Sequence, residues 1–524
     1  PITASHWKEE LDTFKPEVLF VESAWHGKDH SCEQKIACYK QECSEELKEL
    51  IQYCKQQGIK TVFWNKEGLV NFEYFKSASA LFETVFVTDE RMIEEQKQLC
   101  GHERVYILPF AAQPKLHNSI NKHAYYLGEI AFAGNWYGDK HPRRLVDMQN
   151  ILEPALEFDL DIYDRSYERR KELIQVGYYW PYPYRSSIVG GVSYEIMTQL
   201  YKYYHMFLNV NSVQDSKWMI ARRVYEIMAT KTVVVSGYAL SIETQMKDYI
   251  YYSQSEEETR KILSFLIDHP ILRDQKGKKA QRYILENHTY EKRLERILRT
   301  IGLPYEIRIK PMVSIIVWIE SLEELCSLYS QVKRQSYEKI QLKVFYSTAN
   351  KELEDLKFDQ ENIELCPVQP KNLVQAILSQ CTKKFFGEYM TIMCSEYIYG
   401  EHYIRDYVNT FEYIEADIIG KSTVFYYRVS TQNLYKVNYG VGEDCYCEGV
   451  IPGSWMVKCK ALTYEMLEVL LKADTIRNYM NRLGEKKYRI YSDDAFNICL
   501  LGEDIPMEAE FIAHTPNYRL IIEI

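Results

Sequence analysis

The densest group of side chains suited to chemistry lies between residues 209 and 236. Asn211 follows an apolar run, and Arg222, Arg223 and Glu226 come next in a stretch with helical periodicity. On a helix Arg222 lies four residues from Glu226 and Arg223 lies three, so both arginines can face the carboxylate. A guanidinium can neutralise a diphosphate, and a carboxylate can bind the hydroxyls of a ribose. Surface ion pairs show the same spacing, so spacing alone leaves both interpretations open.

A second group follows the apolar run 130–134, where Gly134 and Asn135 begin a loop. A glycine at this place lets the backbone approach a phosphate, and Arg143 or Arg144 could reach the same group. The order G-x-G-x-x-G is missing, so a dinucleotide site is not indicated. An ordinary strand-to-loop turn would explain the same residues.

These groups are positioned by apolar segments of strand length that alternate with helical segments. The first series of expected strands is 17–21, 60–64, 84–88 and 105–108, with a helix at 45–57. The second series is 130–134, 158–163, 206–210, 232–236 and 249–252, followed by a helical segment over 256–301. This alternation predicts parallel sheets built from β-α-β units, in two Rossmann-like domains with a cleft between them.

A third series begins with an expected strand at 313–317, a helix at 323–335 and a strand at 342–345. Pro304 and Pro311 bracket the linker before it. We therefore predict three α/β domains, at 1–120, 121–302 and 303–524. Since the first residues show neither a methionine nor a signal-peptide pattern, we interpret the start as a trimmed point in a longer cytosolic protein.

The composition excludes several classes of protein. A hydrophobic content of 46% and a charged content of 26% are typical of globular proteins. The net charge of −10 argues against a nucleic-acid partner, which requires a basic surface. No apolar run of about 18 residues occurs, so no transmembrane segment is expected. The thirteen cysteines contain no C-x-x-C pair, which favours reduced thiols and a cytoplasmic location.

Eight stretches follow one another in an order that is typical of one enzyme family. They are residues 19–25, 63–67, 85–89, 108–111, 132–137, 207–212, 222–230 and 288–293. Together they resemble the CgeB-like (spore maturation protein) branch of the family-4 glycosyltransferases. The resemblance covers most of the first 300 residues and implies a GT-B fold.

The resemblance also implies a donor site in the second domain. Glu226 would bind the ribose, Arg223 with Arg222 the diphosphate, and Gly134 and Asn135 would line the phosphate loop. With two further residues, the predicted donor-binding set is Gly134, Asn135, Arg144, Asn211, Arg222, Arg223 and Glu226. The donor would be a nucleotide sugar of the UDP or GDP type, and enzymes of this kind require neither a metal nor another cofactor.

Acceptor contacts would come from the first domain, where Trp25, Lys66 and Asp89 stand at strand ends. Glu67 is the expected proton-handling carboxylate, and Arg223 would assist catalysis by stabilising the leaving diphosphate. A solvated loop acid is the alternative interpretation of Glu67. Further residues depart from the family pattern, because Trp218 replaces a second glutamate and Lys231 replaces the glycine after the helix. The transferred sugar therefore stays open.

Residues 311–524 resemble a family-2 glycosyltransferase domain of the GT-A type. The matching stretches are 313–317, 335–340, 399–404, 416–421 and 491–497. The Asp-rich metal motif of that family is represented by Glu396 alone, and its Glu-Asp pair by Ala473 and Asp474. One carboxylate is a poor metal site. We therefore predict a catalytically degenerate domain that binds the acceptor or mediates assembly, including a homo-oligomer.

The expected function is transfer of a sugar, of the hexosyl type, from a nucleotide sugar to a glycan or protein. A nucleotide-sugar 2-epimerase has the same pair of Rossmann-like domains and is one alternative. A non-catalytic carbohydrate-binding or scaffold protein is the other.

Overall fold

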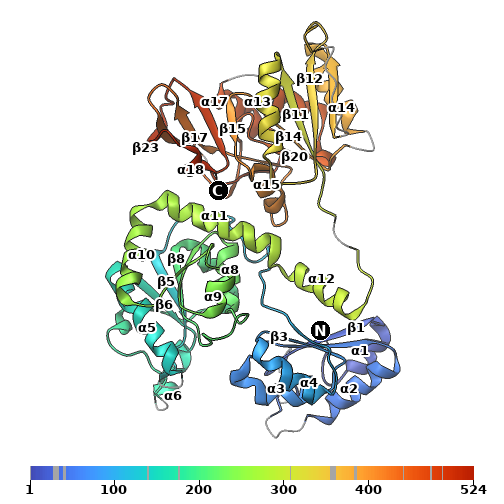
Figure 1. Ribbon diagram of the computed structural model, residues 1–524, viewed down its shortest axis with the longest axis vertical. Coiled ribbons are helices and arrows are strands. Elements are labelled where there is room, and N and C mark those ends of the chain that lie inside the picture. Colours follow the sequence, from blue (N-terminus) through green and yellow to red (C-terminus); the bar gives the residue numbers. More distant parts are fainter. Residues whose placement is uncertain are drawn as a thin grey trace.

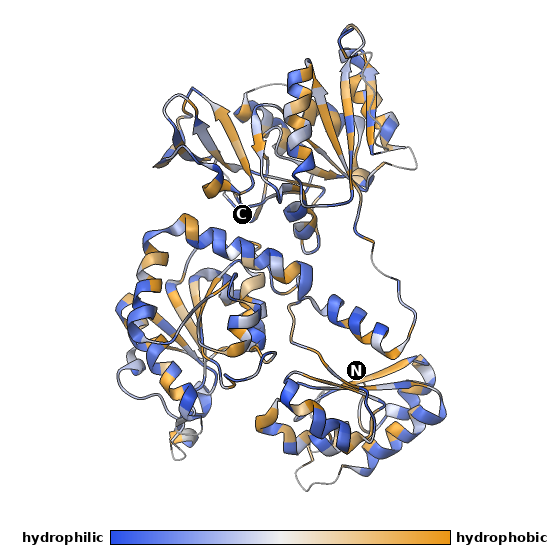
Figure 2. Cartoon of the chain, in the orientation of Figure 1, coloured by the Kyte–Doolittle hydropathy of each residue, from blue (hydrophilic) through white to orange (hydrophobic). Residues whose placement is uncertain are grey.

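The computed structural model describes residues 2–27, 33, 35–38, 43–138, 141–174, 177–306, 309–353, 362–382, 386–440, 442–472, 475–486 and 488–523. They form three α/β domains in chain order (Figure 1). Apolar residues are concentrated in the strands, and the outer surfaces of the helices are mainly hydrophilic (Figure 2). The predicted α/β class with parallel sheets is confirmed. No helix within the described ranges combines the length and apolar character needed to cross a membrane.

The first domain contains a four-stranded parallel sheet in the order β1-β2-β3-β4. Its strands are β1 (Val18–Glu22), β2 (Lys60–Asn65), β3 (Thr84–Val87) and β4 (Val105–Ile107). Its helices are α1 (Trp7–Phe14), α2 (Glu45–Gln56), α3 (Phe72–Ser79) and α4 (Ile93–Cys100), with the short 3₁₀ helix η3 (Glu90–Met92) before α4. Strand β3 is buried along its whole length, which explains why its sequence is a continuous apolar run.

The second domain contains a six-stranded sheet in the order β10-β9-β8-β5-β6-β7, and all of its strands are parallel. They are β5 (Gly128–Gly134), β6 (Leu160–Asp164), β7 (Ile188–Gly190), β8 (Tyr204–Asn209), β9 (Val233–Gly237) and β10 (Tyr251–Ser253). Counted from β7, this is the strand order 3-2-1-4-5-6 of the Rossmann fold. The order reverses between β5 and β8, so a ligand crevice is expected where these two strands end.

The helices of the second domain lie on both faces of this sheet (Figure 1). They are α5 (Pro142–Ala155), α6 (Arg170–Leu173), α7 (Tyr194–Leu200), α8 (Arg222–Ala229), α9 (Leu240–Gln245), α10 (Glu256–Asp268) and α11 (Pro270–Asn287). The expected helical segment 256–301 is therefore divided into α10, α11 and a third helix. Pro270 occupies the first turn of α11, where its missing N–H is tolerated, and it ends α10 because the residue before a proline disfavours helix.

Helix α12 (Tyr290–Ile301) packs on the first domain although it follows the second domain in sequence (Figure 1). Its buried Ile297 joins Val62, Trp64, Phe86 and Leu108 in one apolar cluster. The chain enters and leaves the second domain side by side, because Ala112 and Thr289 form a parallel β-bridge. The predicted range 121–302 thus ends with a helix that covers the sheet of the first domain.

The third domain contains two sheets. The eight-stranded mixed sheet runs β13 (Ile363–Val368), β12 (Ile340–Ser347), β11 (Val313–Ile319), β14 (Tyr389–Ile392), β20 (Met456–Lys458), β16 (Ile418–Gly420), β21 (Ile490–Ser492), β19 (Cys445–Cys447). The five-stranded sheet runs β15 (Tyr397–Tyr399), β22 (Ile498–Gly502), β17 (Thr423–Arg428), β18 (Asn433–Asn438), β23 (Ala509–His514). The helices are α13 (Leu322–Lys333), α14 (Leu373–Cys381), α15 (Tyr403–Phe411), α16 (Tyr464–Leu471), α17 (Ile476–Gly484) and α18 (Arg519–Ile522).

Glu396 and the pair Ala473 and Asp474 are the residues that the sequence places at a degenerate metal site in this domain. Glu396 is exposed in the turn between β14 and β15. Ala473 and Asp474 lie outside the described residues. Among the described residues, no group of three or more histidine, cysteine or acidic side chains is arranged to hold a metal ion.

Candidate active site

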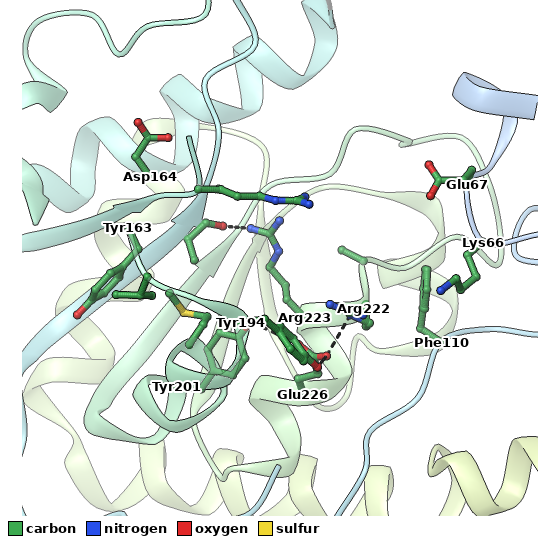
Figure 3. Close-up of a pocket in the computed structure, with 16 residues that line it drawn as sticks. Lys66, Glu67, Phe110, Tyr163, Asp164, Tyr194, Tyr201, Arg222, Arg223 and Glu226 are labelled. Carbon is green, nitrogen blue, oxygen red and sulfur yellow. Dashed lines mark hydrogen bonds and ion pairs between the residues drawn. The ribbon is translucent and has the colours of Figure 1, made fainter. Parts of the chain in front are cut away.

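A cavity of about 470 Å³ is formed by residues of the first and second domains. Lys66 and Glu67 lie on its first-domain side, and Arg222, Arg223 and Glu226 of α8 lie across from them (Figure 3). The structure therefore brings residues that are about 160 positions apart in sequence to one space, as the two-domain prediction required.

A smaller cavity of about 180 Å³ adjoins the first and shares Gly134, Arg165 and Arg223 with it. Asn135 and Arg144 line the smaller cavity, and so does Asn211. The two cavities lie where β5 and β8 end, which is the switch point of the sheet. All residues of the predicted donor-binding set line one or both cavities: Gly134, Asn135, Arg144, Asn211, Arg222, Arg223 and Glu226.

Glu226 is buried and is held by several donors. The Tyr194 hydroxyl donates to its Oε1 atom over 2.6 Å, and the Tyr201 hydroxyl donates to Oε2 over 3.4 Å. Nε of Arg222 lies 3.1 Å from Oε1, in the ion pair that the spacing predicted. An ionised carboxylate can accept about four hydrogen bonds, so Glu226 keeps acceptor capacity for a ligand hydroxyl, mainly at Oε2.

Arg222 and Tyr194 cover this carboxylate from the cavity side. The guanidinium carbon of Arg222 lies 4.5 Å from the centre of the Tyr194 ring, which is within cation–π distance. Behind them, Nε2 of His117 lies 3.7 Å from Oε1 of Glu226 and 3.3 Å from the Tyr194 hydroxyl. Burial lowers the pKa of His117. Its neutral ring accepts the Gln113 N–H at Nδ1, which leaves Nε2 to carry the proton.

Three arginines, Arg144, Arg165 and Arg223, converge at the junction of the two cavities. None of them forms an ion pair with an acidic side chain in the described part of the chain. Arg223 donates to the carbonyl of Ala133, and Arg144 donates to the carbonyl of Asn135 over 3.0 Å. Burial, together with the charge of Arg223, lowers the pKa of Arg144 to about 10. Guanidinium groups that form no ion pair with a carboxylate favour a ligand with several negative charges.

The N-terminal end of α8 adds to this positive region. Asp215 and Ser216 precede this helix and are residue types that often cap helices, but neither caps α8, because the helix begins later, at Arg222, after Ala221. Ser216 instead accepts N–H groups within the loop, from Trp218 at 3.1 Å and Met219 at 3.0 Å. No described side chain caps α8, so its first N–H groups and the positive end of its dipole face the cavity.

Gly134 allows the close approach that the sequence suggested. A Cβ atom at this position would lie 2.9 Å from the Phe132 ring and 3.3 Å from Nη1 of Arg223. Next to it, the buried Oδ1 atom of Asn135 has no hydrogen-bond partner among the described residues. A buried polar atom without a partner is unfavourable, so this oxygen is a candidate ligand contact.

Asn211 lines the smaller cavity but is also part of the scaffold. Its side-chain amide donates to Ser236 Oγ over 3.1 Å and to the Gly237 carbonyl over 2.9 Å, and its Oδ1 accepts from Asn209 over 3.0 Å. These bonds join the ends of β8 and β9. Asn211 therefore fixes the rim of the crevice.

On the first-domain side, Lys66 and Glu67 line the cavity. Nζ of Lys66 pairs with Glu22 over 2.7 Å, and Glu67 accepts a 2.8 Å hydrogen bond from Asn71. Both side chains remain partly accessible, and among the described residues they are the charged groups with which the first domain lines this cavity (Figure 3).

Trp25 and Asp89, two predicted acceptor residues, do not line either cavity. The Trp25 ring packs against Tyr74 and Phe75, with ring centres 5.3 and 5.0 Å apart. Asp89 is fully buried, and its carboxylate accepts from Arg91 over 2.6 Å. Both stand at strand ends, but their side chains turn into the first domain.

Tyr194, Tyr201 and His117 are contacts of Glu226 that the sequence reasoning missed. Tyr194 begins α7 after the short strand β7, which was not expected either. His117 lies in the segment between the domains, and no periodicity marks it. The only available signal was their residue type, since tyrosine and histidine are frequent hydrogen-bond donors to carboxylates.

Comparison with known proteins supports the interpretation of this region. Residues 143–299 match the family model described as glycosyl transferase-like. This segment contains α8 and most of the donor side of the cavities. It defines a transferase-type enzyme domain. None of the curated proteins compared with the chain matches it.

Several solved structures are similar to part of the chain. Sucrose-phosphate synthase from Thermosynechococcus elongatus is 13% identical, with 57% of this chain and 77% of that chain covered and a TM-score of 0.39. A glycosyltransferase from Rickettsia africae ESF-5 is 12% identical, with coverage of 56% and 79% and a TM-score of 0.36. The Anabaena protein HepE, solved in complex with UDP and glucose, is 12% identical, with coverage of 49% and 75% and a TM-score of 0.33.

Proposed function

We propose that the protein transfers a sugar from a nucleotide-sugar donor to a glycan or protein acceptor. The observation that carries the proposal is the arrangement at the switch point of the second sheet. There the buried carboxylate of Glu226 lies one helical turn from Arg223. Arg223 lines the smaller cavity together with Arg144 and Arg165, and these three arginines form no ion pair with an acidic side chain in the described part of the chain. A nucleoside diphosphate presents the complementary groups, a ribose diol and two phosphates.

Each part of the site has a role in this reaction. Glu226 binds the ribose hydroxyls, and Arg223 binds the diphosphate at the N-terminal end of α8. As transfer proceeds, the bond from the anomeric carbon to the diphosphate breaks and negative charge grows on the leaving oxygen. Arg222 and Arg223 stabilise that charge. The acceptor oxygen bonds to the anomeric carbon, and its proton passes to Glu67 from the first-domain side.

The finer assignments belong to the same proposal. The collinear stretches support a place in the CgeB-like branch, and the sequence of the expected metal motif, in which Glu396 is the one carboxylate, supports a non-catalytic third domain. We further propose that transfer needs no divalent metal, so that EDTA leaves it unchanged. A cytoplasmic location agrees with the described cysteines, which form no disulfide.

The experiment is a screen of UDP, GDP, ADP and CMP, with their sugar conjugates, by thermal shift and calorimetry. A ligand present at 100 times its Kd and bound only by the folded protein adds about 2.7 kcal/mol of stability. We expect one nucleotide family to raise the Tm of the wild type. Glu226→Ala should abolish that shift, and the exposed control Glu396→Ala should retain it. The reverse pattern would move the active site to the third domain.

The same nucleotide sugars, incubated with the protein, distinguish a transferase from a 2-epimerase and from a carbohydrate-binding scaffold. A transferase forms a glycosylated product only when an acceptor is present, whereas a 2-epimerase converts the nucleotide sugar alone. A carbohydrate-binding scaffold would bind sugars without affinity for any nucleotide. Either result would overturn the proposed transfer.

A further inference from the structure

Lys231 occupies an unusual place directly after the helix that carries the donor site. Helix α8 ends at Ala229, Thr230 follows, and Lys231 has φ of +61°. The left-handed region after a helix is normally taken by glycine, because other residues are strained there. The Lys231 side chain is nevertheless almost completely buried. A lysine kept in a strained and buried position indicates that its side chain makes specific contacts.

The ammonium group of Lys231 reaches into the third domain. Its Nζ lies 2.6 Å from Asp444, 3.1 Å from Asp493 and 2.6 Å from Asp494. The three carboxylates are at most 4% exposed. Buried charges are tolerated when they are paired and hydrogen-bonded, and removal of one partner leaves the others uncompensated. The contact therefore ties the end of α8 firmly to the third domain.

Helix α11 lies between α8 and the third domain and makes a second connection (Figure 1). On one side the Gln281 amide donates to the Ala229 carbonyl over 3.0 Å, and Gly277 leaves no room for a Cβ against the Lys231 carbonyl. On the other side Nζ of Lys278 lies 2.7 Å from Asp494. The C-terminal end of α8 is thus held by α11 and by the third domain together.

We infer that the third domain positions the donor-binding helix, with Lys231 as the positioning residue. Helix α8 has eight residues, so about 12 Å of rigid helix separates the anchored end from Arg222 and Arg223. A shift of about 1 Å at a site can reduce its effectiveness about a hundredfold. This inference rests on the proposed function. In this inference the third domain contributes to donor binding by holding α8 in place, and it catalyses no reaction itself.

The substitution Lys231→Gly tests the side-chain contact of Lys231 independently of the backbone turn after α8. Glycine adopts a positive φ without strain, so the turn after α8 is kept and only the side-chain contact is lost. We expect the Kd of the best-bound nucleotide to rise at least tenfold. Calorimetry is performed at a temperature where circular dichroism shows every variant folded, because a change of global stability alone would then leave the Kd unchanged.

Asp159→Gly is the matched control. Asp159 is an exposed residue of the same domain with φ of +54°, and it contacts neither α8 nor the third domain in any described interaction. Its substitution should leave the Kd within twofold of the wild type. A Kd of Lys231→Gly that also stays within twofold would overturn the inference.

A second variant keeps the test decisive if Lys231→Gly does not fold. Asp444→Asn retains the size of a third-domain partner but removes its charge, and it should raise the nucleotide Kd at least threefold. An unchanged Kd in Asp444→Asn would contradict the anchoring role. If the wild type binds no nucleotide, the proposed function itself fails, whereas equal affinities of wild type and variants overturn only this inference.

Discussion

The Tyr194 hydroxyl donates a 2.6 Å hydrogen bond to the buried carboxylate of Glu226. The two residues come from different helices, α7 and α8, and both line the larger cavity. The hydroxyl of Tyr194 stabilises the Glu226 carboxylate by this hydrogen bond, while the guanidinium of Arg222 lies over the Tyr194 ring. Glu226, the residue proposed to bind the ribose, is therefore held in one orientation by its neighbours before a donor binds.

Tyr194→Phe should separate support of Glu226 from contact with the ligand. A hydrogen bond to a charged group contributes about 1.5–3 kcal/mol, so the variant should unfold at a lower temperature without ligand. A ribose hydroxyl can replace the missing donor, so the nucleotide-induced rise in Tm should persist. Tyr201→Phe, which removes a longer bond of 3.4 Å, is the control and should lower the Tm less. Loss of the nucleotide effect in Tyr194→Phe would show direct ligand contact instead.

Arg223→Lys should weaken binding of the diphosphate selectively. Lysine keeps the positive charge but cannot present two parallel donors, so we expect about a tenfold increase in the Kd of the nucleoside diphosphate. The nucleoside monophosphate should be affected less, and calorimetry of both ligands measures the ratio. Arg260→Lys, in a surface pair with Glu157, is the control and should change neither Kd. An equal loss for both ligands would argue against a diphosphate contact.

The contact between the first two domains beside the cavity is polar and partly exposed. Glu90 accepts from Ser216 over 2.6 Å and from the Lys217 N–H over 2.7 Å, and Arg91 lies 2.5 Å from Asp215. The exposed ion pair of Arg91 with Asp215 is worth about 0–1 kcal/mol, so the two hydrogen bonds to Glu90 supply much of the strength of this contact.

Replacing Glu90 and Asp215 together by alanine should favour an open arrangement. We expect small-angle X-ray scattering to show a larger radius of gyration in the variant, with the Tm little changed. The wild type in high salt should move in the same direction because salt screens exposed charges. An unchanged radius under both conditions would mean that other contacts hold the domains together.

Asp147→Asn should stabilise the protein in a pH-dependent way. Burial raises the pKa of Asp147 to about 7, although Gln214 donates to the carboxyl over 2.9 Å. The folded state thus binds this proton more tightly than the unfolded chain does. Its stabilising contribution is complete below the ordinary carboxyl pKa and is lost as the pH rises through 7.

The uncharged asparagine avoids that loss. The Tm difference between Asp147→Asn and the wild type should grow between about pH 4 and 7 and stay constant above pH 8. The growth corresponds to about 2–4 kcal/mol. Scanning calorimetry over this range measures the difference. A Tm difference that does not vary with pH would contradict the raised pKa.

Much of the fold could be predicted from apolar runs. The expected strand 84–88 is confirmed as Thr84–Val87, and 232–236 as Val233–Gly237, because buried parallel strands are continuous apolar segments. Strand β7 was missed, since three residues that include a glycine give no pattern. The packing of α12 on the first domain could not be predicted either, because periodicity shows that a helix has an apolar face but not which sheet that face covers.

The site could be predicted as far as the ends of the strands. Gly134 is the last residue of β5 and Asn211 follows β8, and the ends of parallel strands meet at one edge of a sheet. Trp25 and Asp89 also stand at strand ends, but the direction of their side chains is set by packing within the first domain. The contact of Lys231 with the third domain depends on the docking of distant segments, for which the local sequence carries no signal.

The position of α12 limits how this polypeptide can be divided for study. A fragment that stops at residue 120 lacks the helix that covers Val62, Trp64 and Leu108, so apolar surface on its sheet is left open to water. Since Ala112 and Thr289 are neighbours, a short artificial loop could join the chain there and restore the helix to such a fragment. The two walls of the cavity are therefore separable only by cutting the backbone twice.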